Sequence, residues 1–434
     1  MFRYYLALSF TSLRARYWMA TLMIVTLAVG IGVSVASFAL IRAASVDPVP
    51  GKSNLLYVPA FDGWSKGPKT AHPSGLWTYI DAKAALQRRD KDVHVTALYP
   101  VNPVLSEQES TIRPRRINGH AVNADFFTSV DAVFQFGSTW RPDVEARGAR
   151  QVVISSQLNA TLFRGKNSVH RALLLDGQQY QIAGVLNDFD PAPKFYDLDS
   201  GAFATRDDVF VPLTTAMQSG MTSVGNVRCR SHIDNTMDAL GASDCVWLSM
   251  LVELSTPEAV RDFDAWLHNY SGDQMRLGRT RDETQIGLFG LKTWMTNHGA
   301  VPDDVIQLQL VSLGILLVCC ANLMALLLAS FLYKEREVGV RRALGATRSA
   351  ITQQLLTEAS LIGLLSGVVG TLLSVIGIAF IRAFVPPALS EHVSFDITLI
   401  AVALVLAVGA AVLSGVYPAL RAAKLSPIQQ IKAS

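Results

Sequence analysis

Residues that could carry out chemistry are few in this 434-residue chain, and the first candidate is a phosphate-binding loop. The stretch GKS at 51–53 resembles the end of such a loop, but the motif requires a glycine at position 46, where the chain has Val46. Pro48 and Pro50 also remove backbone N–H groups that would hold a phosphate. The sequence therefore predicts no ATP hydrolysis by this route, no catalytic residues and no cofactor bound by this chain.

Metal-binding and nucleophilic patterns are the second set of candidates. The eight histidines show neither the HxxxH nor the HExxH spacing of zinc sites, and we interpret them as surface or hydrogen-bonded core residues. The chain contains no Gly-x-Ser-x-Gly sequence, which would present a serine nucleophile. The acid pairs Asp188/Asp190 and Asp207/Asp208 are interpreted as solvated loop residues, with calcium binding as the open alternative. No metal site is predicted.

Two of the four cysteines are disulfide candidates. Cys229 and Cys245 flank a polar stretch in what we interpret below as an outer domain, where an oxidising compartment would permit a bridge. The alternative is two free thiols. Cys319 and Cys320 lie in a long apolar run and are interpreted as small apolar residues there.

The elements that must position these residues are dominated by four long apolar runs. Apolar residues make up 50% of the chain and charged residues 17%, against roughly 25% charged in soluble domains. The runs cover 18–41, 307–333, 361–381 and 397–420, and each is long enough to cross a hydrocarbon core of about 30 Å as a helix. A cleaved signal peptide is the alternative for the first run. The sequence predicts an integral membrane protein in contact with lipid.

Charges beside the runs predict the orientation, because Lys and Arg are retained on the cytoplasmic side. The flanks 1–17, 334–354 and 421–434 are rich in Lys and Arg, whereas the loop 386–396 has none. The predicted segments are a cytoplasmic start (1–17), a first span (18–41), an outer domain (42–306), a second span (307–333), a cytoplasmic segment (334–354), a third span (355–385), a short outer loop (386–396), a fourth span (397–420) and a cytoplasmic tail (421–434).

The outer domain carries 26 Lys and Arg against 30 Asp and Glu, so its formal charge is −4 (26 − 30). Its sequence mixes strand and helix patterns, which predicts an α+β domain with an inserted lobe at about 120–245. Expected strands are 55–60, 93–104, 207–212, 246–254 and 284–295. A helix is expected over 76–88, and another after Thr256, which is a suitable N-cap before Pro257. With a bulk charge of only +3, nucleic acid is not an expected partner.

Two polar residues lie inside or beside the predicted spans. Asn322 is in the middle of the second span, and its side chain could contact a dimer partner or conduit, or could simply be solvated. Glu358 lies near the cytoplasmic start of the third span, where we favour solvation at the interface.

Two cytoplasmic segments resemble the MacB/FtsX-type permeases of ABC transporters. The first reads KEREVGVRRALGATRSAI over 334–351, and the second reads SGVYPALRAAKLSPIQQI over 414–431. The family-like residues of the first segment are Arg336, Glu337, Gly339, Arg341, Arg342, Ala343, Leu344, Gly345 and Ala346. The outer domain resembles the family's periplasmic core at 118–127, 151–155 and 180–185.

The resemblance implies four transmembrane helices, a large periplasmic α+β domain between the first two, and a dimer of two copies or of related permeases. It also implies a multi-pass protein of the bacterial inner membrane and a separate cytoplasmic ABC ATPase subunit that binds the ATP. The segment between the second and third spans resembles the element that contacts that ATPase, and an apolar stripe with a Glu337–Arg341 pair fits this role. The coupling residues implied are Glu335, Glu337, Val340, Arg341, Leu344, Gly345 and Ile351.

The function expected from the resemblance is export or efflux by mechanotransmission, in which ATPase closure moves the periplasmic domain. A periplasmic adaptor and an outer-membrane duct are possible further partners. The alternatives are an FtsX-like regulator of a periplasmic cell-wall hydrolase and a lipoprotein-extracting permease. A sensor with a ligand-binding periplasmic domain would need a cytoplasmic signalling domain, and the predicted cytoplasmic segments are too short for one.

Overall fold

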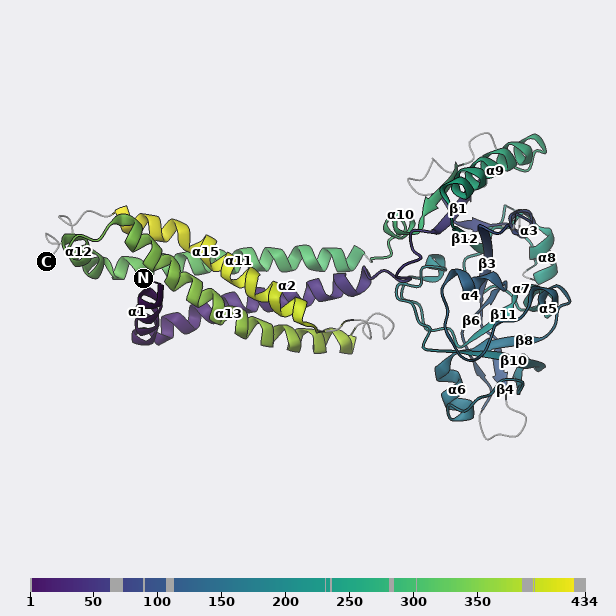
Figure 1. Cartoon of the computed structure of the whole chain (residues 1–434), viewed down its shortest axis with the longest axis horizontal. Helices are drawn as coiled ribbons and strands as arrows, with labels where there is room; N and C mark the ends of the chain where they lie inside the picture. Colours follow the sequence, from purple (N-terminus) through teal and green to yellow (C-terminus); the bar gives the residue numbers. More distant parts are fainter. Residues whose placement is uncertain are drawn as a thin grey trace. The chain divides into compact units, whose positions relative to one another are not determined.

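The computed structural model describes the chain except residues 1, 63–72, 89, 107–112, 231, 235, 281–284, 302, 385–392, 394 and 425–434. The described chain forms two compact units. The helical unit comprises 1–44 and 302–434, and the sheet unit comprises 45–301 (Figure 1).

Four helices of the helical unit are long and apolar enough to cross a membrane, and each contains one of the predicted apolar runs. These helices are α2 (Tyr17–Ala44), α11 (Asp303–Tyr333), α13 (Arg348–Phe384) and α15 (Ile397–Lys424), and they are accompanied by the shorter α1 (Phe2–Ala15) and α12 (Glu335–Ala343). α2 packs against α11 and α13, and α13 packs against α15. A Cβ at Gly363 would lie 2.7 Å from the Cβ of Ala411, so glycine permits the close approach of α13 and α15.

The sheet unit is built on one mixed sheet. Its thirteen strands among the described residues are β1 (Leu56–Asp62), β2 (Leu76–Trp77), β3 (Val93–Val101), β4 (Val104–Ser106), β5 (Arg115–Arg116), β6 (Gly119–Val122), β7 (Phe134–Gly137), β8 (Gln151–Ile154), β9 (Ala172–Leu175), β10 (Gln178–Leu186), β11 (Val209–Pro212), β12 (Leu248–Leu254) and β13 (Gln285–Gly290). The order is β13-β1-β12-β3-β6-β11-β8-β10-β9-β4-β5, with β2 beside β12 and β7 beside β10. Strands from the segment predicted as an inserted lobe continue this sheet from β3 outward.

Helices cover the sheet and bury apolar side chains on both of its faces. They are α3 (Tyr79–Leu86), α4 (Asp125–Ser129), α5 (Pro142–Ala146), α6 (Ser156–Phe163), α7 (Leu213–Gln218), α8 (Met237–Ala242), α9 (Pro257–Arg276) and α10 (Leu291–Asn297). In β3, Ala97 and Tyr99 belong to one core cluster and Leu98 to the other, as the two-residue period of a strand requires.

Several sequence predictions can be compared directly with these bounds. The helix after Thr256 is confirmed: it is α9, and the Thr256 hydroxyl accepts a hydrogen bond from the Ala259 N–H. The helix expected over 76–88 begins only at Tyr79, because Thr78 caps its first turn and the two preceding residues pair with β12. The strand expected over 284–295 ends at Gly290, where α10 begins.

Candidate functional site

A short helix joins two of the long apolar helices and is the first candidate site. Lys334 is the single residue between α11 and α12, and its backbone is not helical (φ −88°, ψ 8°). α12 follows, and a four-residue connection then leads to α13. α12 and α1 lie at the same end of the helical unit (Figure 1).

The end of α12 is fixed by a glycine-dependent cap. The N–H of Gly345 donates to the Arg342 carbonyl (3.1 Å) and the N–H of Ala346 donates to the Arg341 carbonyl (3.0 Å). These two bonds form the Schellman arrangement, which needs a left-handed residue just after the helix. Gly345 supplies it with φ +100°, so the sequence stops α12 at a defined point and leaves Leu344 at its tip.

The beginning of α13 is also fixed by local hydrogen bonds. The Thr347 hydroxyl accepts from the Ala350 N–H (3.2 Å), as an N-cap residue does. The Arg341 guanidinium donates to Gln354 Oε1 (2.8 Å), which joins α12 to the first turns of α13. The connection therefore presents α12 in one orientation relative to α13.

The predicted apolar stripe is divided between two environments. Val340 is 61% exposed and Leu344 is 83% exposed, whereas Ile351 and Leu355 are buried in the helical unit. The helix break at Gly345 separates the two pairs, so they do not continue one face. Val340 and Leu344, four residues apart, form an exposed apolar surface at the end of a helix that carries five charged residues.

The structure thus brings Val340, Leu344 and Gly345 together at one exposed end and directs Ile351 into the bundle. Arg341 is engaged with Gln354. The side chains of Glu335 and Glu337 lie outside the described residues, and with them the predicted Glu337–Arg341 pair.

Our interpretation of Glu358 as a solvated residue is wrong. Glu358 is 3% exposed, and Lys334 Nζ lies 2.6 Å from each of its carboxylate oxygens. The sequence held one signal of this: a carboxylate buried among apolar helices requires a cation at the same depth. Asn322, by contrast, lies on an exposed part of α11.

The sheet unit contains a buried ionic cluster that the sequence did not reveal. His120 on β6 lies between two carboxylates, with Nε2 2.9 Å from Asp197 and Nδ1 3.0 Å from Asp207. Lys194 Nζ lies 3.2 Å from the other oxygen of Asp207, and the Tyr196 hydroxyl donates to Asp207 (2.7 Å). All five side chains are buried. Our interpretation of Asp207 as solvated is therefore wrong. Of the two alternatives given for the histidines, surface or hydrogen-bonded core, His120 adopts the second.

Electrostatics keep this cluster ionised. Burial alone would lower the pKa of His120, but the neighbouring Asp207 and Asp197 carboxylates outweigh it and raise that pKa to about 9. Burial would raise the pKa of Asp207, but His120 and Lys194 hold it well below its ordinary range. With two cations and two carboxylates the cluster is neutral, and it fastens the connection between β10 and β11 to strand β6.

Cys229 and Cys245 form a disulfide in the sheet unit, with their Cα atoms 4.3 Å apart. Their neighbours Arg228 and Val246 exchange backbone hydrogen bonds, so the bridge closes a loop whose ends already pair. Among the described residues no group of three His, Cys, Asp or Glu side chains is arranged to hold a metal ion.

These features define a class: a protein with four helices long and apolar enough to cross a membrane and a large sheet domain between the first two. The chain matches the MacB-like periplasmic core domain over residues 20–269 and the FtsX-like permease C-terminal domain over residues 310–427. It therefore belongs to the MacB/FtsX-type family of ABC transporter permeases.

Curated relatives include the macrolide export ATP-binding/permease protein MacB of Salmonella typhimurium, which is 25% identical over 320 residues, 73% of this chain and 43% of that protein. MacB of Marinobacter nauticus is 27% identical over 299 residues, 68% of this chain and 40% of that protein. The chain thus spans about two fifths of the length of these relatives.

Similar solved structures include the periplasmic region of MacB from Actinobacillus actinomycetemcomitans (TM-score 0.36, 11% identity, 57% of this chain and 94% of that one). The extracellular domain of the ABC-type transporter YknZ from Gram-positive bacteria is another (TM-score 0.34, 16% identity, 53% of this chain and 99% of that one).

Proposed function

We propose that this chain is the permease of a MacB-type ABC transporter in the bacterial inner membrane. In this proposal an ABC ATPase binds the exposed surface of α12, and its ATP-driven movement is passed through the helical unit to the sheet unit in the periplasm. The work done is export or efflux. ATP is bound by the ATPase, and this chain supplies no catalytic residue.

The single observation that carries the proposal is the exposed apolar surface formed by Val340 and Leu344. Both side chains lie on a helix that joins two membrane-spanning helices, and Leu344 is 83% exposed. A leucine held in water by a cap at the tip of a charged helix costs free energy unless a partner covers it. The cap at Gly345 and the Arg341–Gln354 bond give the surface a fixed shape, as a docking element needs.

The remaining parts of the proposal concern assembly. A second permease copy, or a related permease, completes a dimer, and Asn322, which is exposed on α11, would hydrogen-bond across that interface. A periplasmic adaptor and an outer-membrane duct would extend the export path. The disulfide and the buried ionic cluster stiffen the sheet unit, which favours its movement as one body.

The experiment is a charge introduced at the tip of α12. The substitution Leu344→Glu would place a carboxylate in the proposed joint, at a cost of about 3 kcal/mol, roughly a hundredfold in dissociation constant. We expect the tagged variant, purified from membranes of its native host, to lose the co-purifying ATPase while it still inserts and folds. ATP hydrolysis by the purified preparation and quantitation of the ATPase subunit are the measurements.

The matched control is Leu277→Glu. Leu277 is 71% exposed at the end of α9 in the sheet unit. The same substitution there adds the same charge at a comparably exposed leucine, but at a position with no proposed contact. Undiminished ATPase recovery with Leu344→Glu would refute the docking role of α12.

A further inference from the structure

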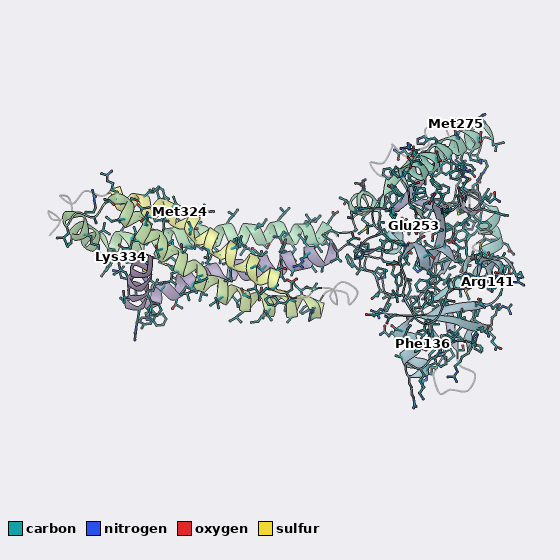
Figure 2. The ribbon with its side chains drawn as sticks, viewed as in Figure 1. Phe136, Arg141, Glu253, Met275, Met324 and Lys334 are labelled. Carbon is teal, nitrogen blue, oxygen red and sulfur yellow. A yellow bond between two sulfur atoms is a disulfide. The ribbon has the colours of Figure 1, made fainter. Side chains whose placement is uncertain are left out.

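We propose that Ser12, Lys334 and Glu358 form a positioning node, called here the Lys334 node, that makes α12 move together with α1 and α13 as one body. This inference rests on the proposed function, because it concerns how a movement received by α12 leaves it. Figure 2 labels Lys334 at the end of the helical unit.

The geometry of the node is that of a fully satisfied ammonium group. Lys334 Nζ lies 2.6 Å from Glu358 Oε1, 2.6 Å from Glu358 Oε2 and 2.5 Å from the Ser12 hydroxyl. The Ser12 hydroxyl in turn donates to Glu358 Oε1 (3.1 Å). The side chains of Lys334 and Glu358 are 9% and 4% exposed. Three elements, α1, the α11–α12 joint and α13, therefore share one water-poor hydrogen-bond network.

Lys334 lies at the joint between α11 and α12, so the network can transmit a movement of α12. Lys334 is the non-helical residue between α11 and α12, and its N–H bonds to the Phe331 carbonyl, three residues back, at 3.1 Å. A break of this kind lets two helices change their mutual angle with small backbone rotations. Lys334, the residue at this break, is bonded to Glu358 on α13 and to Ser12 on α1. A displacement of α12 is therefore passed through Lys334 to α13 and α1.

A second set of contacts holds the corner between α1 and α2 against the last turn of α11. The Arg16 guanidinium lies 4.0 Å from the centroid of the Tyr333 ring, and its Nη1 donates to the Ser330 carbonyl (3.4 Å). This contact lies beside the node, because Tyr333 directly precedes Lys334. It keeps α1 close enough for Ser12 to remain in the network.

Stability alone does not explain a buried ion pair here. Replacing both partners of such a pair with apolar residues is often neutral or stabilising, whereas removing one partner is costly. The double variant Lys334→Met with Glu358→Leu is therefore expected to keep the fold but to lose the coupling of α12 movement to α1 and α13. The exchanged pair, Lys334→Glu with Glu358→Lys, keeps opposite charges at the same two positions and is expected to restore it.

The test follows α1 while nucleotide drives the assembled complex of permease and ATPase. A cysteine replaces the exposed Thr11 on α1, and its rate of maleimide labelling is measured with and without a non-hydrolysable ATP analogue. With the native node and with the exchanged pair we expect nucleotide to change that rate by about fivefold or more. The apolar pair should bind the ATPase and melt normally, yet show no nucleotide effect at Thr11→Cys.

The matched control removes an ion pair from the opposite end of the helical unit. Arg42 and Asp396 lie 2.8 Å apart there, and the pair Arg42→Met with Asp396→Leu should leave the nucleotide effect intact. An unchanged effect in the apolar node pair, or no effect with the native node, would overturn the proposal. Loss of ATPase co-purification on Leu344→Glu is a separate measurement, so failure of the node and failure of the proposed function are distinguishable.

Discussion

Replacing His120 with leucine tests the ionic cluster of the sheet unit. His120 is 1% exposed, and its neighbours raise its pKa from 6.5 to about 9. Each pKa unit corresponds to about 1.4 kcal/mol, so the charged imidazole contributes about 3 kcal/mol to folding. Removing the imidazole leaves Asp197 and Asp207 buried with Lys194 as the remaining cation of the cluster. We therefore expect His120→Leu to lower the free energy of unfolding by at least this amount.

The sign of the pH dependence follows from the raised pKa. A folded-state pKa above the unfolded value gives stability that is fully present below pH 6.5 and is lost as pH rises through about 9. Native protein should therefore lose this contribution between pH 6.5 and pH 10, and His120→Leu should lack that component. The lowered pKa values of Asp197 and Asp207 act at the other end, where stability falls as acid protonates them.

Tryptophan fluorescence is the suitable assay for the full chain in detergent, because six of its seven tryptophans lie in residues 45–301. For a unit of this size about 1 kcal/mol shifts the melting temperature by roughly 2–4 °C, so we expect a decrease of about 6–12 °C at pH 6.5. His268→Leu is the matched control, since His268 is exposed on α9. Equal pH dependence of melting in native protein and His120→Leu would refute the reasoning.

Three further predictions address the bridge, the topology and the dimer. Replacing Cys229 and Cys245 with serine should lower the free energy of unfolding of the sheet unit by about 3 kcal/mol, measured by the same melting assay against native protein. Ser138→Cys should react with an impermeant maleimide in intact cells, and Ser349→Cys only after permeabilisation; the reverse pattern would contradict the four-span orientation. Asn322→Leu should weaken self-association of the purified permease by about 1 kcal/mol in analytical ultracentrifugation, and an unchanged dissociation constant would exclude Asn322 from the interface.

Local patterns determined which elements could be predicted from the sequence. The four apolar runs are long and uncharged, so their identity as helices depends on composition alone. The start of α9 was predictable because Thr256 and Pro257 act within one turn. The helix expected over 76–88 failed at its start because pairing of Leu76 and Trp77 with β12, a contact over 170 residues away in sequence, overrides local helix propensity.

The candidate sites show the same division between local and distant causes. Gly345 could be identified from the family-like segment, and its left-handed backbone ends α12 as such a residue should. The splitting of the apolar stripe was not predictable, because a helical projection continued across that break places Val340 and Ile351 on one face. Only the packing of α13 shows that Ile351 is buried while Leu344 remains exposed.

The His120 cluster and the Lys334–Glu358 pair show which contacts a single sequence cannot reveal and which it allows one to infer. The contacts of His120 with Asp197 and Asp207 join residues separated by 77 and 87 positions, so no local pattern marks them. Burial of a charge nevertheless requires an opposite charge at the same place. Glu358, within a helix of mostly apolar residues, therefore indicated a nearby cation. Lys334 is a basic residue at the predicted cytoplasmic end of the preceding span. A charged residue beside an apolar run is thus better interpreted as half of an ion pair than as a solvated end, and in this chain the pair joins the residue between α11 and α12 to α13.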